Sequence, residues 1–237
     1  MIDIRTLEWD SCFFNKKIGL LSVSDTDKID KEVILSKMIS FDVVQIKIPS
    51  MYYFLAQDLK EIGFQYIEGE VSFSCPVSEK SPSSFKFEIA KIDDFQNLCK
   101  ITAGSFKYSR FKEPYFSHMQ REKFYCQWIK NAILGVYDDM CLVLKDEDDC
   151  ILGYVTLKHL FDGAKIGLLC VSPKFLGMGI GTRLINLSKD SLLERKIGTL
   201  YVATQLSNIE AQKLYKKNNF IEKDECQWLY FSRHVNS

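Results

Sequence analysis

Three glycines, Gly177, Gly179 and Gly181, are spaced two residues apart between an apolar run and an amphipathic stretch. The run at 166–171 has the length and composition of a buried strand, and apolar residues recur at helical spacing after Gly181. A helix that begins in such a turn presents backbone N–H groups without partners, and its dipole favours negative charge. Because glycine has no Cβ, an anion can approach the backbone closely. The pattern predicts a pyrophosphate site; a turn that only packs the helix against a sheet is the alternative.

Two common phosphate motifs do not fit this segment. Gly181 is followed by Thr182 and Arg183, whereas a Walker loop requires Gly-Lys followed by Ser or Thr. A dinucleotide-binding fingerprint requires another small residue after two intervening positions and an acid about 20 residues later. Thr182 is a poor match for the small residue, and the segment 199–203 contains no acid. Too few residues follow Gly181 to complete a dinucleotide domain. We therefore expect a short pyrophosphate loop late in a small α/β domain.

The composition is that of an ordinary globular protein. The chain has 237 residues, enough for one large domain or two small ones, with 46% hydrophobic and 26% charged residues. Lys+Arg and Asp+Glu both number 31. This balance argues against a dedicated binder of nucleic acid or of a membrane surface, which would have a basic excess. A small anionic ligand needs only a local basic patch and stays open.

The cysteines and histidines predict neither disulfides nor a metal site. None of the eight cysteines forms a Cys-x-x-Cys pair, and most lie in apolar runs, as buried reduced thiols do. The histidines, His118, His159 and His234, have no ligand spacing to the cysteines, so no metal is expected. The first ten residues do not resemble a signal peptide, and no apolar run reaches 18 residues. The expected location is the cytoplasm.

Alternating strand and helix patterns predict a small α/β domain in the first 80 residues. Strands are expected at 2–7, 18–23, 41–48 and 64–76, with an aromatic turn at 9–17. Helices are expected at 28–38, capped by Thr26 or Asp27, and at 51–62, capped by Ser50 and ended by Gly63. The Ser- and Pro-containing segment 78–84 is the linker-like stretch. It divides the chain into predicted domains 1–80 and 85–237.

The second predicted domain holds the glycine turn. Its expected elements are strands at 85–91, 140–145, 150–159, 165–171, 199–204 and 226–231, and helices at 93–106, 118–134, after Gly181, and at 207–217. The irregular segment 107–117 is rich in aromatic residues and either lines a pocket or packs against the domain. Residues 59–64 echo 214–220, which makes the first domain a candidate degenerate copy of the second.

Two segments together resemble one family. Residues 171–182, Val-Ser-Pro-Lys-Phe-Leu-Gly-Met-Gly-Ile-Gly-Thr, resemble the acetyl-CoA pyrophosphate loop of the GCN5-related N-acetyltransferases (GNATs). Asn208, Ala211, Tyr215 and Phe220 have the spacing of the helix and strand that follow this loop in the family. The resemblance implies an α/β (α+β) protein with the GNAT fold, a central mixed, mostly antiparallel sheet flanked by helices. Here that fold would follow the small α/β N-terminal domain.

A closer but scattered resemblance, to the bacterial TDP-fucosamine N-acetyltransferases within this family, spans both predicted domains. It implies transfer of acetyl from acetyl-CoA to the amine of a nucleotide-linked amino-dideoxyhexose, by direct attack, in surface-polysaccharide biosynthesis. Two positions depart from the general family pattern. Leu176 replaces the usual Arg or Gln at the head of the loop, and Asn219 replaces the usual Gly. The segments that carry this resemblance are Trp9-Asp10 with Phe13-Phe14, 109–114, 124–129, 166–169, 202–205 and 228–230.

The resemblance also assigns roles to residues around the cofactor. Tyr215 has the position of the general acid, and a phenol with a pKa of about 10 can supply a proton to the leaving thiolate at neutral pH. Leu169 is expected to offer backbone hydrogen bonds to the pantetheine arm. Asn208 has a position that contacts the same arm, and a helix cap is its structural alternative. The residues expected to bind the cofactor are Leu169, Val171, Gly177, Met178, Gly179, Ile180, Gly181, Thr182 and Asn208.

The acceptor side is less well defined by the sequence. Arg110 is a candidate contact for the nucleotide diphosphate, because a guanidinium suits phosphate geometry, and a structural salt bridge is its alternative. Tyr115, from the same loop, is a second candidate substrate contact. A base must take the proton of the amine, and the candidates are a water, Glu113 or His159. Cys170 lacks an accompanying His or acid and is not expected to act as a nucleophile.

Two alternative functions are also compatible with the sequence. The acceptor could be a protein N-terminus, a lysine or a small amine, which composition leaves open. The chain could instead be a non-catalytic module that binds acyl-CoA, although an intact Tyr215 argues against this. No nucleic-acid or membrane partner is expected. Pairing of an exposed sheet edge would give a homodimer, a question that the sequence leaves open.

Overall fold

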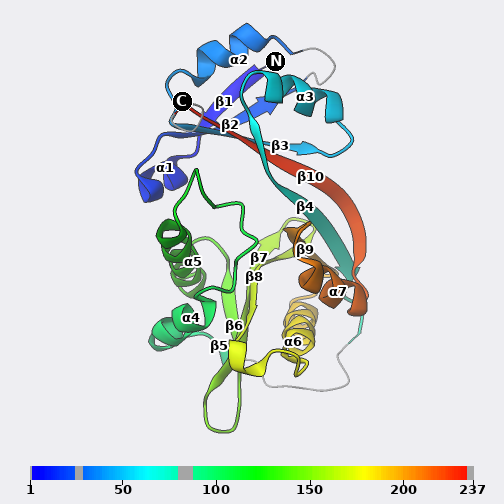
Figure 1. The fold of residues 1–237 in the computed structure, drawn as a ribbon. Coiled ribbons are helices and arrows are strands. Elements are labelled where there is room, and N and C mark those ends of the chain that lie inside the picture. Colours follow the sequence, from blue (N-terminus) through cyan, green and yellow to red (C-terminus); the bar gives the residue numbers. More distant parts are fainter. Residues whose placement is uncertain (1, 25–28, 80–87, 234–237) are drawn as a thin grey trace.

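The computed structural model describes residues 2–24, 29–79 and 88–233, and their strands form one ten-stranded sheet (Figure 1). The strand order is β1-β2-β3-β10-β4-β9-β8-β7-β6-β5, and only the pairs β2–β3 and β8–β9 are parallel. The strands are β1 (Ile2–Thr6), β2 (Ile18–Val23), β3 (Val43–Pro49), β4 (Gln65–Pro76), β5 (Glu88–Ile89), β6 (Met140–Lys145), β7 (Ile151–Leu160), β8 (Gly163–Val171), β9 (Thr199–Gln205) and β10 (Ile221–Ser232). The helices are α1 (Glu8–Phe14), α2 (Lys31–Met38), α3 (Tyr53–Glu61), α4 (Phe95–Thr102), α5 (His118–Ile133), α6 (Ile180–Glu194) and α7 (Ile209–Lys217).

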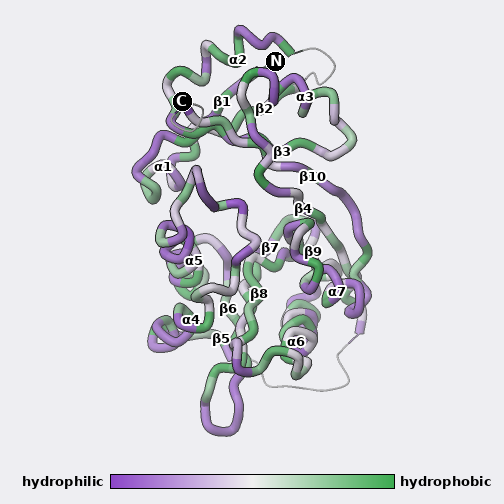
Figure 2. Tube along the Cα trace, in the orientation of Figure 1, coloured by the Kyte–Doolittle hydropathy of each residue, from purple (hydrophilic) through white to green (hydrophobic). Residues whose placement is uncertain are grey.

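Helices cover both faces of the strands β6–β8. In Figure 1, α4 and α5 lie on one side of these strands and α6 lies on the other, with α7 beside it. Each side has its own buried core, one with Leu184 of α6 and Tyr215 of α7, the other with Leu98 of α4 and Ile129 of α5. The tip of the β6–β7 hairpin, at the bottom of the view, is hydrophilic (Figure 2). The predicted mixed, mostly antiparallel sheet flanked by helices is confirmed.

The first part of the chain adds a third core. Helices α2 and α3 pack on one face of β1–β3, where Ile34, Leu59 and Val44 are buried. On the opposite face, α1 places Phe14 against Phe124 of α5, and these two rings are stacked. The N-terminal strands are therefore held both by their own helices and by contacts with the second part of the chain.

Three predicted details of this part are wrong. The segment 9–17 contains helix α1 rather than only a turn, and the helix ends at Asn15, which has a left-handed φ of 51°. Leu7 at its N-cap makes no side-chain hydrogen bond, so the sequence shows no start signal there. Helix α2 begins at Lys31 because the carboxylate of Asp30 accepts from two backbone N–H groups; the predicted cap at 26–27 lies outside the described residues. Helix α3 begins at Tyr53 without a side-chain cap.

In the second part, two elements have bounds other than those predicted, and residues 85–87 of the first predicted strand lie outside the described residues. Strand β5 is described only at Glu88–Ile89, and a short 3₁₀ helix at Ile92–Asp94 precedes α4, which ends at Thr102 rather than near 106. The irregular segment 107–117 mainly packs down, since Phe111, Tyr115 and Phe116 are buried. The remaining predicted strands and helices are present, with ends that differ by a few residues.

The last strand of the chain lies in the middle of the sheet. β10 pairs antiparallel with β3 on one side and with β4 on the other, and β4 also pairs with β9. Strands from both predicted domains therefore belong to one sheet, and the division of the chain into domains 1–80 and 85–237 stays a prediction. The echo between 59–64 and 214–220 corresponds to two helix–turn–strand units, each with a left-handed residue, Gly63 (φ 100°) or Asn219 (φ 65°).

We expect residues 1–79 alone to remain unfolded, because β3 and β4 both need β10 as their partner. The same fragment with residues 219–233 appended through a glycine-serine linker should fold more stably, since β10 is then restored. Circular dichroism during urea titration measures both. A cooperative unfolding transition in the fragment 1–79, equal to that of the extended fragment, would contradict the dependence on β10.

Candidate active site

The strands β8 and β9 separate after a short paired region. Only three residue pairs are made, Ala164↔Leu200, Lys165↔Tyr201 and Ile166↔Val202. Beyond them, β8 stays paired with β7 as far as Val171, and β9 stays paired with β4 as far as Gln205. The backbone of β8 at 167–171 and that of β9 at 203–205 therefore form no ladder hydrogen bonds with each other. We call this region the β8–β9 opening.

The glycine turn lies directly after β8 and begins helix α6. Gly177 and Gly179 have left-handed φ values of 79° and 77°, which favour glycine. Gly179 is the N-cap, no side chain caps the helix, and no acid lies in its first turn. The first N–H groups of α6 therefore have no helical partner, and nothing in this turn repels an anion. Leu176 and Met178 are exposed beside them.

Gly181 must be a glycine for a different physical reason from Gly177 and Gly179. It is buried in α6, and a Cβ there would lie 2.9 Å from Cδ2 of Leu214 on α7. Its role in the structure is to allow α6 and α7 to approach. Thr182, the next residue, accepts a hydrogen bond from Nδ2 of Asn218 at 3.2 Å, which also links the two helices.

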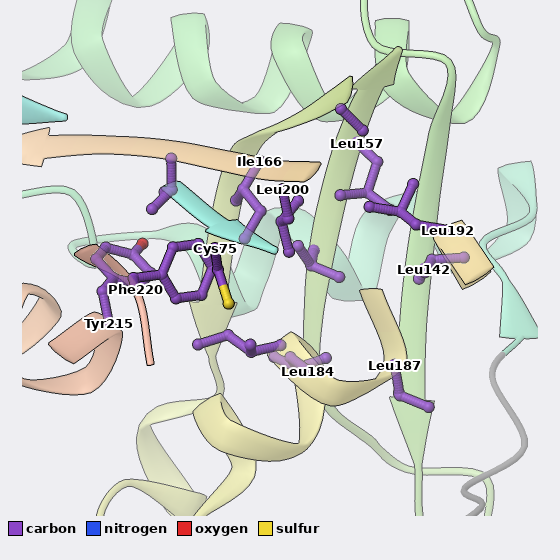
Figure 3. Close-up of a cluster of buried hydrophobic side chains, with 14 of the residues drawn as sticks. Cys75, Leu142, Leu157, Ile166, Leu184, Leu187, Leu192, Leu200, Tyr215 and Phe220 are labelled. Carbon is purple, nitrogen blue, oxygen red and sulfur yellow. The ribbon is translucent and has the colours of Figure 1, made fainter. Parts of the chain in front are cut away.

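Tyr215 is buried on α7 between two aromatic rings. Its ring centroid lies 5.8 Å from that of Phe73 and 5.5 Å from that of Phe220. Burial raises the pKa of its hydroxyl well above the ordinary tyrosine value, so the phenol is protonated at neutral pH. Figure 3 shows Tyr215 and Phe220 at one end of the core that α6 and α7 form with the sheet.

The structure brings most of the predicted cofactor residues together. Leu169 and Val171, at the end of β8, pack against the same core that contains Ile180 and Tyr215. Asn208 is the N-cap of α7, where its side-chain oxygen accepts from the N–H of Ala211 at 3.2 Å. The helix-capping role of Asn208 is thus observed, and its contact with a cofactor stays a prediction.

Arg110 and Tyr115 lie on the other side of the sheet, against α1, α5 and β10. The guanidinium carbon of Arg110 lies 4.2 Å from the ring centroid of Phe111 and 4.0 Å from that of Trp228. Its Nη1 donates to Oε1 of Gln45 at 2.8 Å and to the hydroxyl of Tyr230. Among the described residues Arg110 has no ion-pair partner within 4.0 Å, so the predicted structural salt bridge is not seen. It is a fixed, half-buried cation.

Tyr115 has a packing role in this structure. It is buried, and its hydroxyl donates to the backbone oxygen of Tyr230 at 3.1 Å and to Oε1 of Gln65 at 3.3 Å. Burial, followed by the proximity of Tyr230, raises its pKa to about 12. A contact of Tyr115 with substrate stays a prediction.

The other titratable candidates lie in contrasting surroundings. Glu113 is exposed. His159 lies near the end of β7, opposite Ala164, with its Nδ1 3.9 Å from Oδ2 of Asp139. Burial raises the pKa of the Cys170 thiol to about 11, so this thiol is protonated at neutral pH.

The sequence did not indicate the polar residues that lie on the same face of the sheet as Arg110. Lys47 of β3 forms an ion pair with Glu70 of β4 at 2.5 Å, and Nε1 of Trp228 donates to the same carboxylate at 3.1 Å. Burial alone would raise the pKa of Glu70, but Lys47 outweighs it and lowers the pKa below its ordinary value. Lys112 forms an ion pair with Glu68 at 3.3 Å. Adjacent positions in separate strands carry no local signal for such pairs.

Comparison with known proteins identifies this arrangement. The model of the acetyltransferase (GNAT) family matches residues 96–220, which include the glycine turn, α6, β9 and α7. The chain belongs to the GNAT acetyltransferase family. This GNAT protein is 30% identical, over 96% of its length and 97% of the relative's, to a dTDP-fucosamine acetyltransferase of Escherichia coli O6:H1. It is 23% identical, over 96% of its length and 80% of the relative's, to the spore coat polysaccharide biosynthesis protein SpsD of Bacillus subtilis.

A solved structure confirms the fold. A GCN5-related N-acetyltransferase from Sphaerobacter thermophilus superposes with a TM-score of 0.64 at 12% identity, over 98% of this chain and 76% of that one. The resemblance predicted from the glycine segment and the residues around Tyr215 is therefore confirmed, and the chain is an acetyl-CoA-dependent N-acetyltransferase. Within the described parts of the chain, no group of three His, Cys, Asp or Glu residues is arranged to hold a metal ion. No helix in those parts has the length and apolar composition needed to span a bilayer.

Gly177→Ala and Gly179→Ala should each weaken acetyl-CoA binding about 5- to 30-fold, because a left-handed φ costs an L-residue roughly 1–2 kcal/mol and the backbone will move away from it. Isothermal titration calorimetry measures the change. Gly104→Ala is the matched control, since Gly104 has a φ of 73° and open space around its Cβ position but lies outside the turn. Equal losses of affinity in all three variants would contradict a specific role of the turn.

Proposed function

We propose that this enzyme transfers the acetyl group of acetyl-CoA to the amine of a nucleotide-linked amino sugar, of the TDP-amino-dideoxyhexose type, for the synthesis of a surface polysaccharide. The main support is the full-length similarity to a dTDP-fucosamine acetyltransferase, which extends through the N-terminal strands as well as the GNAT part. The second relative, a spore coat polysaccharide biosynthesis protein, is matched over nearly the whole chain too.

From the β8–β9 opening we infer that one face of the sheet binds acetyl-CoA and the opposite face binds the acceptor. On the α6 and α7 side, the glycine turn would hold the pyrophosphate of acetyl-CoA, and the free backbone edges at 167–171 would bind the pantetheine arm. Leu169, Val171 and Asn208 are proposed to line this arm. Because the opening passes between two strands, the acetyl group would reach the opposite face, where the N-terminal part and the loop of Arg110 meet.

On that opposite face, Arg110 fits a contact with the diphosphate of the acceptor. Its guanidinium carbon lies 4.2 Å from the ring centroid of Phe111 and 4.0 Å from that of Trp228, and its Nη1 donates to Gln45 and Tyr230, so its position is fixed before any ligand binds. Arg110 also interacts electrostatically with Asp10. Burial raises the pKa of Asp10, and the positive charge of Arg110 opposes that rise. A cation held by hydrogen bonds to Gln45 and Tyr230, without an ion-pair partner among the described residues, would recognise an anionic acceptor better than a neutral one.

The reaction requires attack by the free amine and protonation of the departing sulfur. The amine nitrogen forms the new bond to the carbonyl carbon, the carbon–sulfur bond breaks, and the hydroxyl of Tyr215 is proposed to give its proton to the sulfur. Burial raises the pKa of Tyr215, so the phenol carries at neutral pH the proton that this role requires, although the same rise makes it a weaker acid. The free state of all eight cysteines agrees with a cytoplasmic location, where thiols stay reduced.

The acceptor class is tested by measuring CoA release with acetyl-CoA and a panel of TDP-amino sugars, free amino sugars, polyamines and peptides. We expect turnover with the TDP-amino sugars. Turnover only with peptides or polyamines would favour the reading as a protein or small-amine acetyltransferase. Binding of acetyl-CoA without turnover on any acceptor would favour a non-catalytic module.

Tyr215→Phe should lower kcat about a hundredfold or more and leave the affinity for acetyl-CoA unchanged, because the variant removes only the proton donor. Steady-state kinetics and calorimetry measure the two effects. Tyr201→Phe is the matched control, since it loses a hydroxyl that bonds to Asp162 at 3.0 Å. Unchanged turnover in Tyr215→Phe would falsify the role as general acid.

Arg110→Lys should raise KM for the TDP-amino sugar about 10- to 100-fold, the range for loss of a charge-assisted hydrogen bond, and leave KM for acetyl-CoA unchanged. The matched control is the free amino sugar, which lacks the diphosphate, so its KM should not respond. A similar rise in KM for both acceptors would show that Arg110 acts on the structure of the site rather than on phosphate.

A further inference from the structure

A β-bulge lies in β8 at the β8–β9 opening. In the β7–β8 ladder, Leu157 pairs with Ile166 and Val155 pairs with Leu169, so Gly167 and Leu168 both stand opposite Thr156. One residue more on β8 than on β7 breaks the regular alternation of hydrogen bonds and re-aims the backbone. The bulge comes immediately after Ile166, the last residue that β8 pairs with β9. It therefore shapes the part of β8 that borders the opening.

A chain of hydrogen bonds ties this bulge to a buried carboxylate. The N–H of Leu168 donates to Oγ1 of Thr156 at 2.8 Å, and Thr156 donates to Oδ2 of Asp138 at 2.6 Å. The same Oδ2 accepts from Nε1 of Trp128 at 2.8 Å. Thr156 is 0% exposed and Asp138 is 1% exposed. The chain thus joins helix α5, the segment after it, β7 and β8.

The direction of these bonds follows from the donors available. A hydroxyl has one proton, and that of Thr156 is directed to the carboxylate, which accepts but does not donate. A lone pair of Oγ1 is therefore left to accept from Leu168, whose N–H lies in the irregular part of the ladder. Asp138 fixes the orientation of Thr156, and Thr156 in turn fixes the bulge.

Gly167 is required for the same arrangement. A Cβ at this position would overlap Oδ2 of Asp138 and lie 2.8 Å from Oγ1 of Thr156. Gly167 has no left-handed φ, so its lack of a side chain serves close approach rather than backbone conformation. The carboxylate thus packs directly against the backbone of the bulge.

We propose that Asp138 and Thr156 are positioning residues for acetyl transfer, because they hold the β8 bulge in the geometry that presents its backbone to the thioester. The inference rests on the proposed placement of acetyl-CoA in the β8–β9 opening, and it is independent of the acceptor's identity. Neither side chain touches the acetyl group in this scheme. Both act through the backbone of residues 167–169.

The arrangement of the bonds separates this role from catalysis by the charge of Asp138. The hydrogen bonds from Trp128 and Thr156 converge on one oxygen, Oδ2. An asparagine can place its single carbonyl oxygen there, keep both bonds and lose the charge. Asp138→Asn should therefore preserve positioning and abolish any function as a base, whereas Asp138→Ala should abolish both.

The test compares Thr156→Val, Thr156→Ser, Asp138→Ala and Asp138→Asn. Calorimetry gives the affinities for acetyl-CoA and for CoA separately, and kinetics with the acceptor found in the panel give kcat. We expect Thr156→Val and Asp138→Ala to lose about tenfold in kcat and to lose the difference in affinity between acetyl-CoA and CoA. Thr156→Ser and Asp138→Asn should stay within about threefold of the unaltered protein in both.

The matched control is Thr102→Val, which removes another buried threonine hydroxyl, bonded to Tyr154 at 2.6 Å and to the backbone oxygen of Leu98 at 2.7 Å. Its Tm should fall about as much as that of Thr156→Val, with the ratio of affinities unchanged. If Thr156→Val or Asp138→Ala does not fold, Asp138→Asn decides alone, since low activity in this variant would overturn the proposal.

Two results would overturn the proposal. Activity in Asp138→Asn as low as in Asp138→Ala would mean that the charge is needed. A Thr156→Val variant with unaltered kcat and affinity ratio would mean that the bulge does not depend on the hydroxyl. Because the affinity ratio needs no acceptor, failure of the acceptor panel alone would count against the proposed function and not against this role.

Discussion

The end of the pairing between β8 and β9 determines where the whole candidate site lies. Two parallel strands that diverge leave backbone N–H and C=O groups without partners, which is costly when those groups are buried. Here each strand keeps its other edge fully paired, β8 with β7 and β9 with β4. The unpaired groups are therefore confined to the two edges that face each other. A ligand with amides of its own, such as a pantetheine arm, can satisfy them.

The two faces of the sheet supply different parts of the chemistry. Helices α6 and α7 provide the free N–H groups of the glycine turn and the buried phenol of Tyr215. The opposite face is built from α4, α5 and the loop of Arg110, together with α1 and β10. Aromatic contacts such as Phe14 against Phe116, with centroids 4.4 Å apart, join the N-terminal strands to this face. The face proposed to bind the acceptor thus depends on the N-terminal part of the chain, whereas the face proposed to bind acetyl-CoA is built by the GNAT part.

Much of the local structure could be predicted from the sequence because its causes are local. Gly63 was expected to end a helix, and it has a left-handed φ there; Asn219, which replaces the usual Gly of the family, has a left-handed φ as well. Helix α1 was missed because Leu7 gives no capping signal and the helix is stabilised by burial of Phe14 against distant residues. The glycine pattern predicted a turn, but only the structure separates Gly181, which allows helix packing, from Gly177 and Gly179, which supply left-handed turns.

Long-range pairing could not be predicted in the same way. No periodicity in residues 221–232 indicates that they lie between β3 and β4, since any strand with two paired edges has a similar composition. Asp138 was not singled out in the sequence, because its contacts with Trp128 and Thr156 depend on how α5 and β7 pack. A glycine inside the apolar run of β8, Gly167, was the one sequence signal of a close approach there.

The central position of β10 has a consequence for synthesis on the ribosome. Gln45 and Lys47 are synthesised more than 180 residues before their strand partners Tyr230 and Trp228. The N-terminal strands therefore stay incompletely paired until residues 228–230 emerge from the ribosome. Contacts so distant in sequence slow folding and expose strand edges that can aggregate. The polar and charged residues of β10, such as Glu222 and Asp224, would help to keep this late strand dissolved until its place in the sheet is ready.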